Sequence, residues 1–464
     1  MTSAARQFKQ DAQRVTADRR HRQIINTALD KYALKRDEKK GLFQDWRGAR
    51  QLAAQTKWQA ISQLDRHLEQ FTRGLEARGA KVNWASTGAQ AREIILGILW
   101  ARQARTVVKS KAMTAEEIHL NEALERAGLA VVESDLGEFI VQLRGEPPYH
   151  IVFPAMHLTR GEIQQTFQDK LGDAPSDNPE DLTMVARRVL RKKYLEADAG
   201  ITGANFAVAE TGMISLTENE GNARLTAALP KTLITLVGIE KVVPRLEDLA
   251  LFLPMLATVG AGQLISGYNT LYGGPRQAGE PDGPEEYHVV LLDNNRTALL
   301  ADPERRETLH CIRCGSCLNV CPIYRNVGGH TYGTTYCGPI GAVITPNLRG
   351  LADWQHLAYA SSLCGACAEA CPVAINLHHH LLQNRRNAAR AKPSWWQKLA
   401  FTLFAPVANH RLAWTLITKL GRLGQKLHPL ILGTRLDPAY AWTKTRNLPS
   451  FATTSFKTWW RTRS

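Results

Sequence analysis

The stretch CIRCGSCLNVCP at residues 311–322 decides how the last third of the chain is organised. Its spacing, C-x2-C-x2-C-x3-C-P, is the run with which bacterial ferredoxins hold iron–sulfur clusters, and in two-cluster ferredoxins its fourth cysteine ligates the other cluster. Three thiolates two residues apart can wrap one cubane, and the proline then turns the chain away. The stretch therefore predicts an iron–sulfur centre.

A second stretch, CGACAEACP at residues 364–372, repeats the last three cysteines of that run. Ser361 occupies the place of the missing first cysteine, and Cys337 is the one cysteine left to substitute for it. If Cys337 is not a ligand, the second centre holds three irons or uses a non-cysteine ligand. We expect two [4Fe–4S] clusters, named cluster 1 and cluster 2. Their expected ligands are Cys311, Cys314, Cys317 and Cys371 for cluster 1, and Cys321, Cys364, Cys367 and Cys337 for cluster 2.

Two other metal-site interpretations are weaker. Paired C-x2-C units also bind structural zinc, but zinc does not explain the two x3-C-P endings. The histidines at 378–380 follow the last cysteine. Three adjacent residues cannot share one face of a helix. We therefore expect these histidines to begin a helix that packs beside the clusters, without ligating them.

The placement of the cysteines also indicates a cellular compartment. None lies before residue 311 or after residue 371, so no disulfide framework runs through the chain. Clustered thiols are typical of metal ligands in a reducing compartment. The N-terminus lacks the apolar segment of a secretory signal, and no apolar stretch reaches about 18 residues. We expect a cytoplasmic protein without a membrane-spanning helix.

The net charge of +15 is concentrated in the tail at 388–464. That segment has 13 Lys or Arg against a single acid, Asp437, and six of the 11 tryptophans. Such a composition suits an anionic membrane surface, which would place the protein at the inner face of the cell membrane. It also suits docking on another subunit, which we favour. Nucleic-acid binding is not favoured, because no recognised fold or aromatic platform supports it.

The pattern along the chain predicts four segments. Apolar residues at helical spacing mark the N-terminal region. Strands that alternate with helices then indicate an α/β domain with a mostly parallel sheet. The expected segments are a helical N-terminal region at 1–84, the α/β domain at 85–300, an α-helical ferredoxin-type dicluster domain at 301–387 and a basic helical tail at 388–464.

Within the α/β domain the pattern predicts individual elements. The runs 129–134, 138–143 and 149–155 are apolar and β-branched enough to suggest strands. Thr114 is expected to cap the start of a long helix. The Gly- and Pro-rich segment 267–288 predicts a shaped loop.

Several long motifs resemble one bacterial family. ITGANFAVAETGMISLTENEGNARL at 201–225 and LITLVGIEKVVP at 233–244 are similar to the α/β domain of the iron–sulfur subunit of bacterial L-lactate utilisation complexes. The segments 107–124 and 266–288 look like the same family, as does the tail ending LPSFATTSFKTWWR at 448–461. The resemblance covers essentially the whole chain.

The resemblance implies a fold, a function and partners. The α/β domain would be similar to the sugar-isomerase and CoA-transferase-like fold, and the cysteine domain to the helical ferredoxin of respiratory subunits. The chain would transfer electrons in a multi-subunit complex that oxidises L-lactate to pyruvate and so allows growth on lactate. The implied partners are a cysteine-rich subunit and a second α/β subunit.

The α/β domain also carries candidates for substrate chemistry. A 2-hydroxy acid needs a cation for its carboxylate and a base for its hydroxyl. Lys111 or Arg224 with Glu210 or Glu220 would supply both, although such residues more often cap helices and order turns. We find no fingerprint for NAD or FAD and no P-loop. The alternatives to the subunit interpretation are a self-contained hydroxy-acid oxidoreductase and, less favoured, a non-redox iron–sulfur binding or sensor protein.

Overall fold

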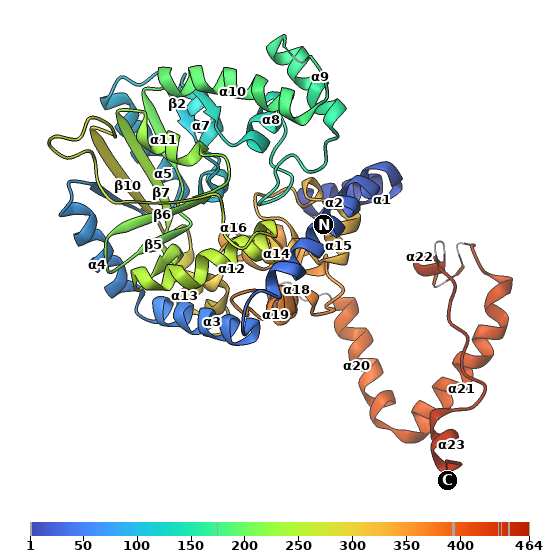
Figure 1. The fold of residues 1–464 in the computed structure, drawn as a ribbon. Helices are drawn as coiled ribbons and strands as arrows, with labels where there is room; N and C mark the ends of the chain where they lie inside the picture. Colours follow the sequence, from blue (N-terminus) through green and yellow to red (C-terminus); the bar gives the residue numbers. More distant parts are fainter. Residues whose placement is uncertain are drawn as a thin grey trace. The chain divides into compact units, whose positions relative to one another are not determined.

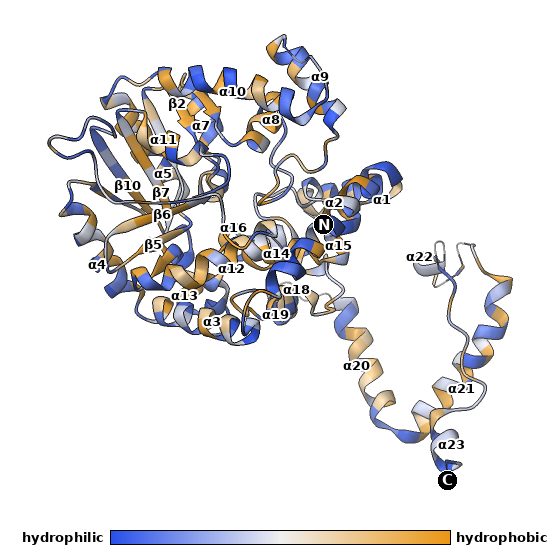
Figure 2. Ribbon diagram, viewed as in Figure 1, coloured by the Kyte–Doolittle hydropathy of each residue, from blue (hydrophilic) through white to orange (hydrophobic). Residues whose placement is uncertain are grey.

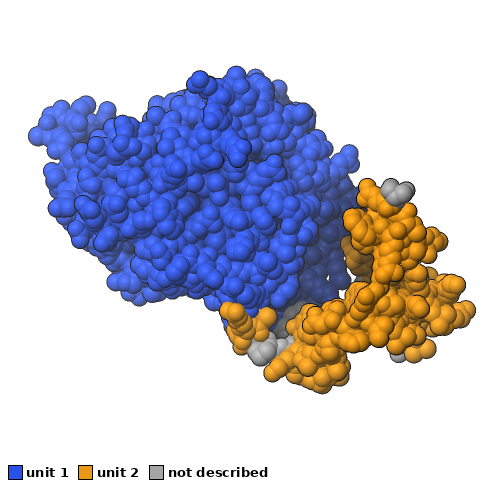
Figure 3. Space-filling view, turned by 90° about the horizontal axis from the view of Figure 1, so that it is seen from below, with its two compact units in different colours: residues 1–388 blue, residues 389–464 orange. Residues whose placement is uncertain are grey.

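The computed structural model describes residues 2–173, 175–391, 395–434, 436–437, 439–443 and 446–463. The chain forms two compact units, residues 1–388 and 389–464, which are coloured separately in Figure 3. The first contains the predicted N-terminal, α/β and cysteine segments, and the second contains nearly all of the predicted tail.

A parallel, six-stranded sheet forms the centre of the α/β domain (Figure 1). All of its neighbouring strands pair in parallel, which confirms the predicted parallel sheet. Every residue of its strand β7 is buried, as expected for a parallel strand covered on both faces. In spatial order the strands are β1 (Lys81–Ala85), β10 (Glu286–Leu292), β7 (Thr232–Gly238), β4 (Ala199–Thr202), β2 (Thr106–Lys109) and β3 (Ala130–Glu133).

A second, four-stranded sheet lies beside the first. Its order is β8 (Val242–Val243), β5 (Phe206–Val208), β6 (Met213–Glu218) and β9 (Tyr268–Tyr272). Strand β9 was not expected, because it lies in the segment predicted as a loop. It forms by antiparallel pairing with β6, a partner that local Gly and Pro content does not reveal.

Two predicted strands of the α/β domain are wrong. Residues 138–143 lie in the helix α8 (Leu136–Arg144), because the Asp135 side chain accepts from the Glu138 N–H and Gly145 ends the helix in the left-handed region. Residues 149–155 form an irregular loop. The helix predicted from Thr114 also differs: α6 (Met113–Glu117) is followed by a left-handed residue, His119, before α7 (Leu120–Arg126) begins.

The other helices of the α/β domain pack either on the sheet or on neighbouring helices. Helices α5 and α11 contact its strands directly, whereas α9 packs on α8 and α10. These helices are α5 (Gly88–Ala101), α9 (Arg160–Leu171), α10 (Pro179–Glu196), α11 (Asn222–Ala228), α12 (Leu249–Ala261) and α13 (Arg296–Ala301).

The N-terminal region is helical up to Glu76, but residues 81–84, predicted as part of it, belong to strand β1 and pair with β10 of the parallel sheet. Helix α2 contacts α12 of the α/β domain and α15 of the cysteine domain. One apolar core includes Leu29 of α2, Phe252 of α12 and Tyr324 of α15, so the N-terminal helices join the two domains. The N-terminal helices are α1 (Ser3–Ala17), α2 (Arg19–Lys40), α3 (Trp46–Ser62) and α4 (Leu64–Glu76).

The cysteine domain is built from short helices between its loops. The histidines at 378–380 lie in α19, as predicted for a helix after the last cysteine. The helices are α14 (Ser316–Asn319), α15 (Pro322–Val327), α16 (Gly338–Arg349), α17 (Leu351–Trp354), α18 (Ala366–Ala370) and α19 (Leu377–Ala391).

The second unit is helical, and Figure 2 shows apolar residues along α20 (Trp395–Asn409) and α21 (Arg411–Leu427). Many of the apolar side chains of this unit are exposed. Helices α20 and α21 contact one another, and the short helices α22 (Tyr440–Thr443) and α23 (Phe456–Arg461) follow. Within the described residues, no helix is both long and apolar enough to cross a membrane. The exposed leucines of α21 recur at helical spacing: Leu412, Leu416, Leu420, Leu423 and Leu427.

Replacing Gly200 with alanine tests the packing of α11 on β4. A Cβ at Gly200 would lie 2.1 Å from the carbonyl oxygen of Thr226, so helix or strand must shift. We expect the free energy of unfolding to fall by about 1–3 kcal/mol, measured by chemical denaturation. Gly97→Ala is the control, because nothing lies within 4 Å of a Cβ there. It should raise stability by up to about 1 kcal/mol. Equal effects would contradict this packing.

Candidate metal centre and adjoining pocket

Four thiols gather around the first cysteine loop. Burial raises the pKa of Cys314, and the neighbouring thiols of Cys371 and Cys311 raise it further. Burial also raises the pKa of Cys317, with contributions from Cys314, Cys311 and Cys371. Each of the four is buried. The set is the one that the sequence predicted for cluster 1.

Contacts between α14 and α18 bring the two cysteine stretches together. The Ser316 hydroxyl donates to the carbonyl oxygen of Ala370 at 3.2 Å, which joins the residue before Cys317 to the residue before Cys371. This contact lets each stretch contribute one thiol to the group that lies mainly on the other stretch. The first stretch contributes Cys321 and the second contributes Cys371.

A second group contains Cys321, Cys364 and Cys367. Burial raises the pKa of Cys367 to about 11, and Cys321 and Cys364 contribute to the rise. Cys364 is exposed, whereas Cys321 and Cys367 are buried. This group therefore reaches the molecular surface.

Cys337 lies in neither cysteine loop, although it contributes with Cys321 and Cys317 to the raised pKa of Tyr332. It precedes α16, and its Sγ donates to the carbonyl oxygen of Tyr149 at 3.9 Å. Burial raises its pKa to about 12, and no other thiol of the described chain contributes to that rise. Its role as fourth ligand of cluster 2 stays a prediction.

The cysteine loops have the chemistry that a cluster requires. All eight cysteines are free thiols. Backbone N–H groups point at sulfur: that of Arg313 lies 3.4 Å from Cys311 Sγ, and that of Ile375 lies 3.4 Å from Cys371 Sγ. Hydrogen bonds to sulfur are one of the means by which proteins set cluster potentials. Metal binding would replace the protons that burial favours on Cys314, Cys317 and Cys371.

A buried ionic network supports the first cysteine loop. Arg296 is 1% exposed and donates to both carboxylate oxygens of Glu117, at 2.9 and 2.8 Å. It also pairs with Glu240, whose other oxygen accepts from Arg313 at 3.0 Å. Burial opposes ionisation of Glu240, but Arg296 and Arg313 outweigh it and lower its pKa to about 2. The network thus links α6, the residues after β7, α13 and the cysteine loop.

Two further cations lie beside this network. Lys57 donates to the carbonyl oxygens of Glu240 and Val242, at 2.6 and 3.2 Å. Burial lowers the pKa of Lys57 to about 7 and that of Lys241 to about 8. Positive charge near Cys311 suits an anionic cluster. Sequence reasoning missed these residues, because they come from segments far apart and share no local pattern.

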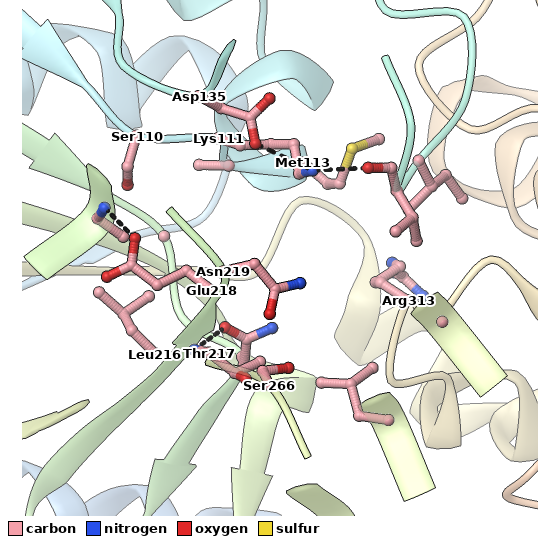
Figure 4. A pocket seen from close by; sticks show the side chains of 18 of the residues that line it. Ser110, Lys111, Met113, Asp135, Leu216, Thr217, Glu218, Asn219, Ser266 and Arg313 are labelled. Atoms are coloured by element: carbon pink, nitrogen blue, oxygen red, sulfur yellow. Dashed lines mark hydrogen bonds and ion pairs between the residues drawn. The ribbon is translucent and has the colours of Figure 1, made fainter. Parts of the chain in front are cut away.

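A cavity of about 290 Å³ lies between the sheet and the cysteine loop. It opens at the carboxyl ends of β2, β3 and β4, where ligands commonly bind in α/β sheets. Ile312 and Arg313 of the cysteine loop line it, so the pocket reaches residues adjacent to two expected ligands of cluster 1. Figure 4 shows Lys111 beside Asp135 at the top of the view and Arg313 at its right.

The pocket contains two of the four predicted catalytic candidates. Lys111 Nζ lies 3.3 Å from Asp135 and donates to the carbonyl oxygen of Val152 at 2.9 Å. Burial and then Asp135 raise the pKa of Glu220 to about 7. The residue as a whole is exposed, which moderates this shift. One Glu220 oxygen accepts from the Leu136 N–H at 3.0 Å.

The other two candidates lie outside this pocket. Glu210 accepts from the backbone N–H of Leu246 at 2.9 Å, which orders the chain before α12. The guanidinium of Arg224 lies over the ring of Tyr268, 4.4 Å from its centroid. Glu210 and Arg224 therefore have structural contacts, which is the alternative to catalysis that the sequence analysis considered for them.

Comparison with known proteins follows the same division of the chain. Residues 68–292 match the LUD domain, and residues 307–375 match a 4Fe-4S dicluster domain. Lactate utilization protein B of Oceanobacillus iheyensis is 43% identical over 450 residues, which cover 96% of this chain and 93% of that protein. The proteins of that name from Shouchella clausii and Geobacillus kaustophilus are 43% and 44% identical, covering 95% and 92% of this chain and 94% and 90% of theirs. The chain belongs to the lactate utilization protein B family.

Membership of this family confirms the resemblance seen in the sequence. The dicluster match spans all eight cysteines, so two [4Fe–4S] clusters are the cofactors of this family member. Among solved structures, a DUF162 family protein from Deinococcus radiodurans is 18% identical with a TM-score of 0.28, over 49% of this chain and 98% of that chain. That likeness is too distant to bear on the fold.

Replacing Arg296 tests the buried network. Arg296→Met would remove the partner that the buried Glu117 and Glu240 share and leave Glu240 paired with Arg313. We expect a loss of about 3–5 kcal/mol in the free energy of unfolding. Urea denaturation of anaerobically purified protein, followed by circular dichroism, measures it. The control is Arg188→Met, whose pair with Asp173 is roughly half exposed (55% and 49%). That change should cost less than about 1 kcal/mol. A similar small loss in both variants would contradict the network's role.

Proposed function

We propose that this chain is the iron–sulfur electron-transfer subunit of a multi-subunit complex that oxidises L-lactate to pyruvate, which allows growth on lactate. The supporting observation is the arrangement of the two thiol groups. One group is buried beside the pocket, and the other includes the exposed Cys364. The names of the relatives, lactate utilization protein B, agree with this role.

We propose seven of the eight cluster ligands that the sequence predicted. The eighth, Cys337, was predicted as the fourth ligand of cluster 2, and that position is left out of the ligand sets proposed for this function. The cysteines proposed for cluster 1 are Cys311, Cys314, Cys317 and Cys371, and those for cluster 2 are Cys321, Cys364 and Cys367.

The protein residues would give the two centres different surroundings. Once bound, the clusters supply two one-electron carriers. Arg313 and its ionic network lie beside the first group and hold positive charge near it. Cys364 leaves the second group open to a partner that donates or accepts electrons. We infer that electrons enter and leave the protein at this exposed face.

The partners and the tail belong to the same proposal. The complex would contain a cysteine-rich subunit and a second α/β subunit, and the protein would be cytoplasmic. The α/β domain would share the sugar-isomerase and CoA-transferase-like fold. We favour docking of the tail on a partner, because its exposed tryptophans and leucines lie among cations. Contact with the inner face of the cell membrane is the alternative, and flotation with anionic lipid vesicles distinguishes the two.

The pocket favours a second candidate function, in which this chain itself binds the hydroxy acid. Lys111 offers a cation for a carboxylate, and Glu220 is placed to exchange a proton near neutral pH. Arg313 faces the same cavity from the cysteine loop. Turnover of lactate by the isolated chain with an artificial acceptor would support this candidate and overturn the subunit proposal.

Removing one thiol of the buried group tests the electron-transfer proposal. Cys317→Ala should remove iron from cluster 1 and abolish lactate-dependent electron flow in the complex, because alanine offers no atom that can ligate the cluster. The α/β domain should stay folded. Iron and sulfide analysis, circular dichroism and lactate-dependent dye reduction measure these effects against anaerobic wild type. Retention of both clusters would show that the ligand set is wrong.

The pocket predicts how carboxylate binding depends on pH. As pH rises through about 7, Glu220 loses its proton and adds negative charge beside Lys111. We expect the affinity for L-lactate to fall on the order of tenfold over this range, measured by calorimetry on the holoprotein. Glu220→Gln should remove the fall, whereas Glu210→Gln should keep it, because Glu210 lies outside the pocket. A Glu220→Gln profile like that of wild type would exclude this role.

A further inference from the structure

The two cysteine loops repeat one another fifty positions apart. Gly315 and Gly365 both adopt the left-handed conformation, with φ of 74° and 83°. The residues two positions earlier, Arg313 and Leu363, also have positive φ, at 60° and 57°. Positive φ is uncommon for residues other than glycine, so this match indicates that the two loops follow the same path.

The hydrogen bonds that follow the glycines repeat as well. The Leu318 N–H donates to the carbonyl oxygen of Gly315 at 3.0 Å, and the Ala368 N–H donates to that of Gly365 at 2.9 Å. Three cysteines of one loop therefore stand in the same backbone positions as three of the other. The pairs are Cys314 with Cys364, Cys317 with Cys367, and Cys321 with Cys371.

Ser361 is the counterpart of the remaining cysteine, Cys311. The Arg313 N–H points at Cys311 Sγ at 3.4 Å, and the Leu363 N–H points at Ser361 Oγ at 3.1 Å. The shorter distance is expected, because oxygen is smaller than sulfur. The Ser361 oxygen thus occupies the same position in the second loop as the sulfur of Cys311, an expected ligand of cluster 1, occupies in the first.

The alternative ligand, Cys337, comes from a different segment of the chain. It precedes α16 and lies outside both loops. Its Sγ donates to the carbonyl oxygen of Tyr149, which belongs to the α/β domain. The glycine after it packs on Leu318 of α14, close to the first loop.

We propose that Ser361 Oγ is the fourth ligand of cluster 2. The inference rests on the division of cysteines in the proposed function. The Oγ–H bond breaks, an Oγ–iron bond forms and the proton passes to solvent, with no electron transferred. An alkoxide is a harder donor than a thiolate and stabilises the oxidised cluster. Cluster 2 therefore has a lower reduction potential than it would have with four cysteines.

Three variants, purified without oxygen beside wild type, test the ligand. Ser361→Ala should lose one iron per chain and show the paramagnetic resonance of an oxidised three-iron centre. Ser361→Cys should keep all its iron and raise the midpoint potential of one cluster. Cys337→Ala is the matched control and should keep the iron, sulfide and potentials of wild type.

Two results would overturn the assignment. One is loss of cluster 2 iron in Cys337→Ala, and the other is wild-type iron and potentials in Ser361→Ala. If Ser361→Ala does not fold, wild-type cluster potentials in Ser361→Cys would also overturn the assignment. These measurements use no lactate, so their outcome does not depend on whether the complex oxidises lactate. Failure of the proposed function would instead show in wild type, as zinc or as an absence of acid-labile sulfide.

Discussion

The buried guanidinium of Arg296 is the constraint on which the first unit depends. It pairs with Glu117 and Glu240, and Glu240 in turn pairs with Arg313 in the cysteine loop. Charges removed from water need these partners, so segments separated by well over a hundred residues are fixed against one another. The same ion pairs place the cysteine loop over the carboxyl ends of the sheet's strands. The pocket beside the expected cluster 1 follows from that placement.

The sequence predicted the fold where a pattern was long or strongly periodic. Alternating strands and helices identified the parallel sheet, and the cysteine spacing identified the dicluster domain. The prediction of a strand at residues 138–143 was wrong, because a short apolar run fits a helix as well as a strand. There the Asp135 cap and Gly145 decide for the helix. Strand β9 was missed because its pairing partner lies some fifty residues earlier.

The candidate site was predictable in part for a similar reason. Lys111 and Glu220 stand near strand ends, and such positions meet at one edge of a parallel sheet. Glu210 and Arg224 fit the same local description but serve the backbone and an aromatic ring. Arg313 and Lys241 carried no local signal, since their place in the pocket wall depends on how the two domains pack.

The exposure of Cys364 has a cost as well as a use. A thiolate at the surface is open to dioxygen and peroxide, which attack accessible sulfur first. The cluster that a redox partner can reach is then also the one that oxidants reach. Assembly of the complex would cover this face, so the free chain should be the oxygen-labile form and the assembled one the durable form. Cells that make the subunits together would shorten the time for which the vulnerable surface is bare.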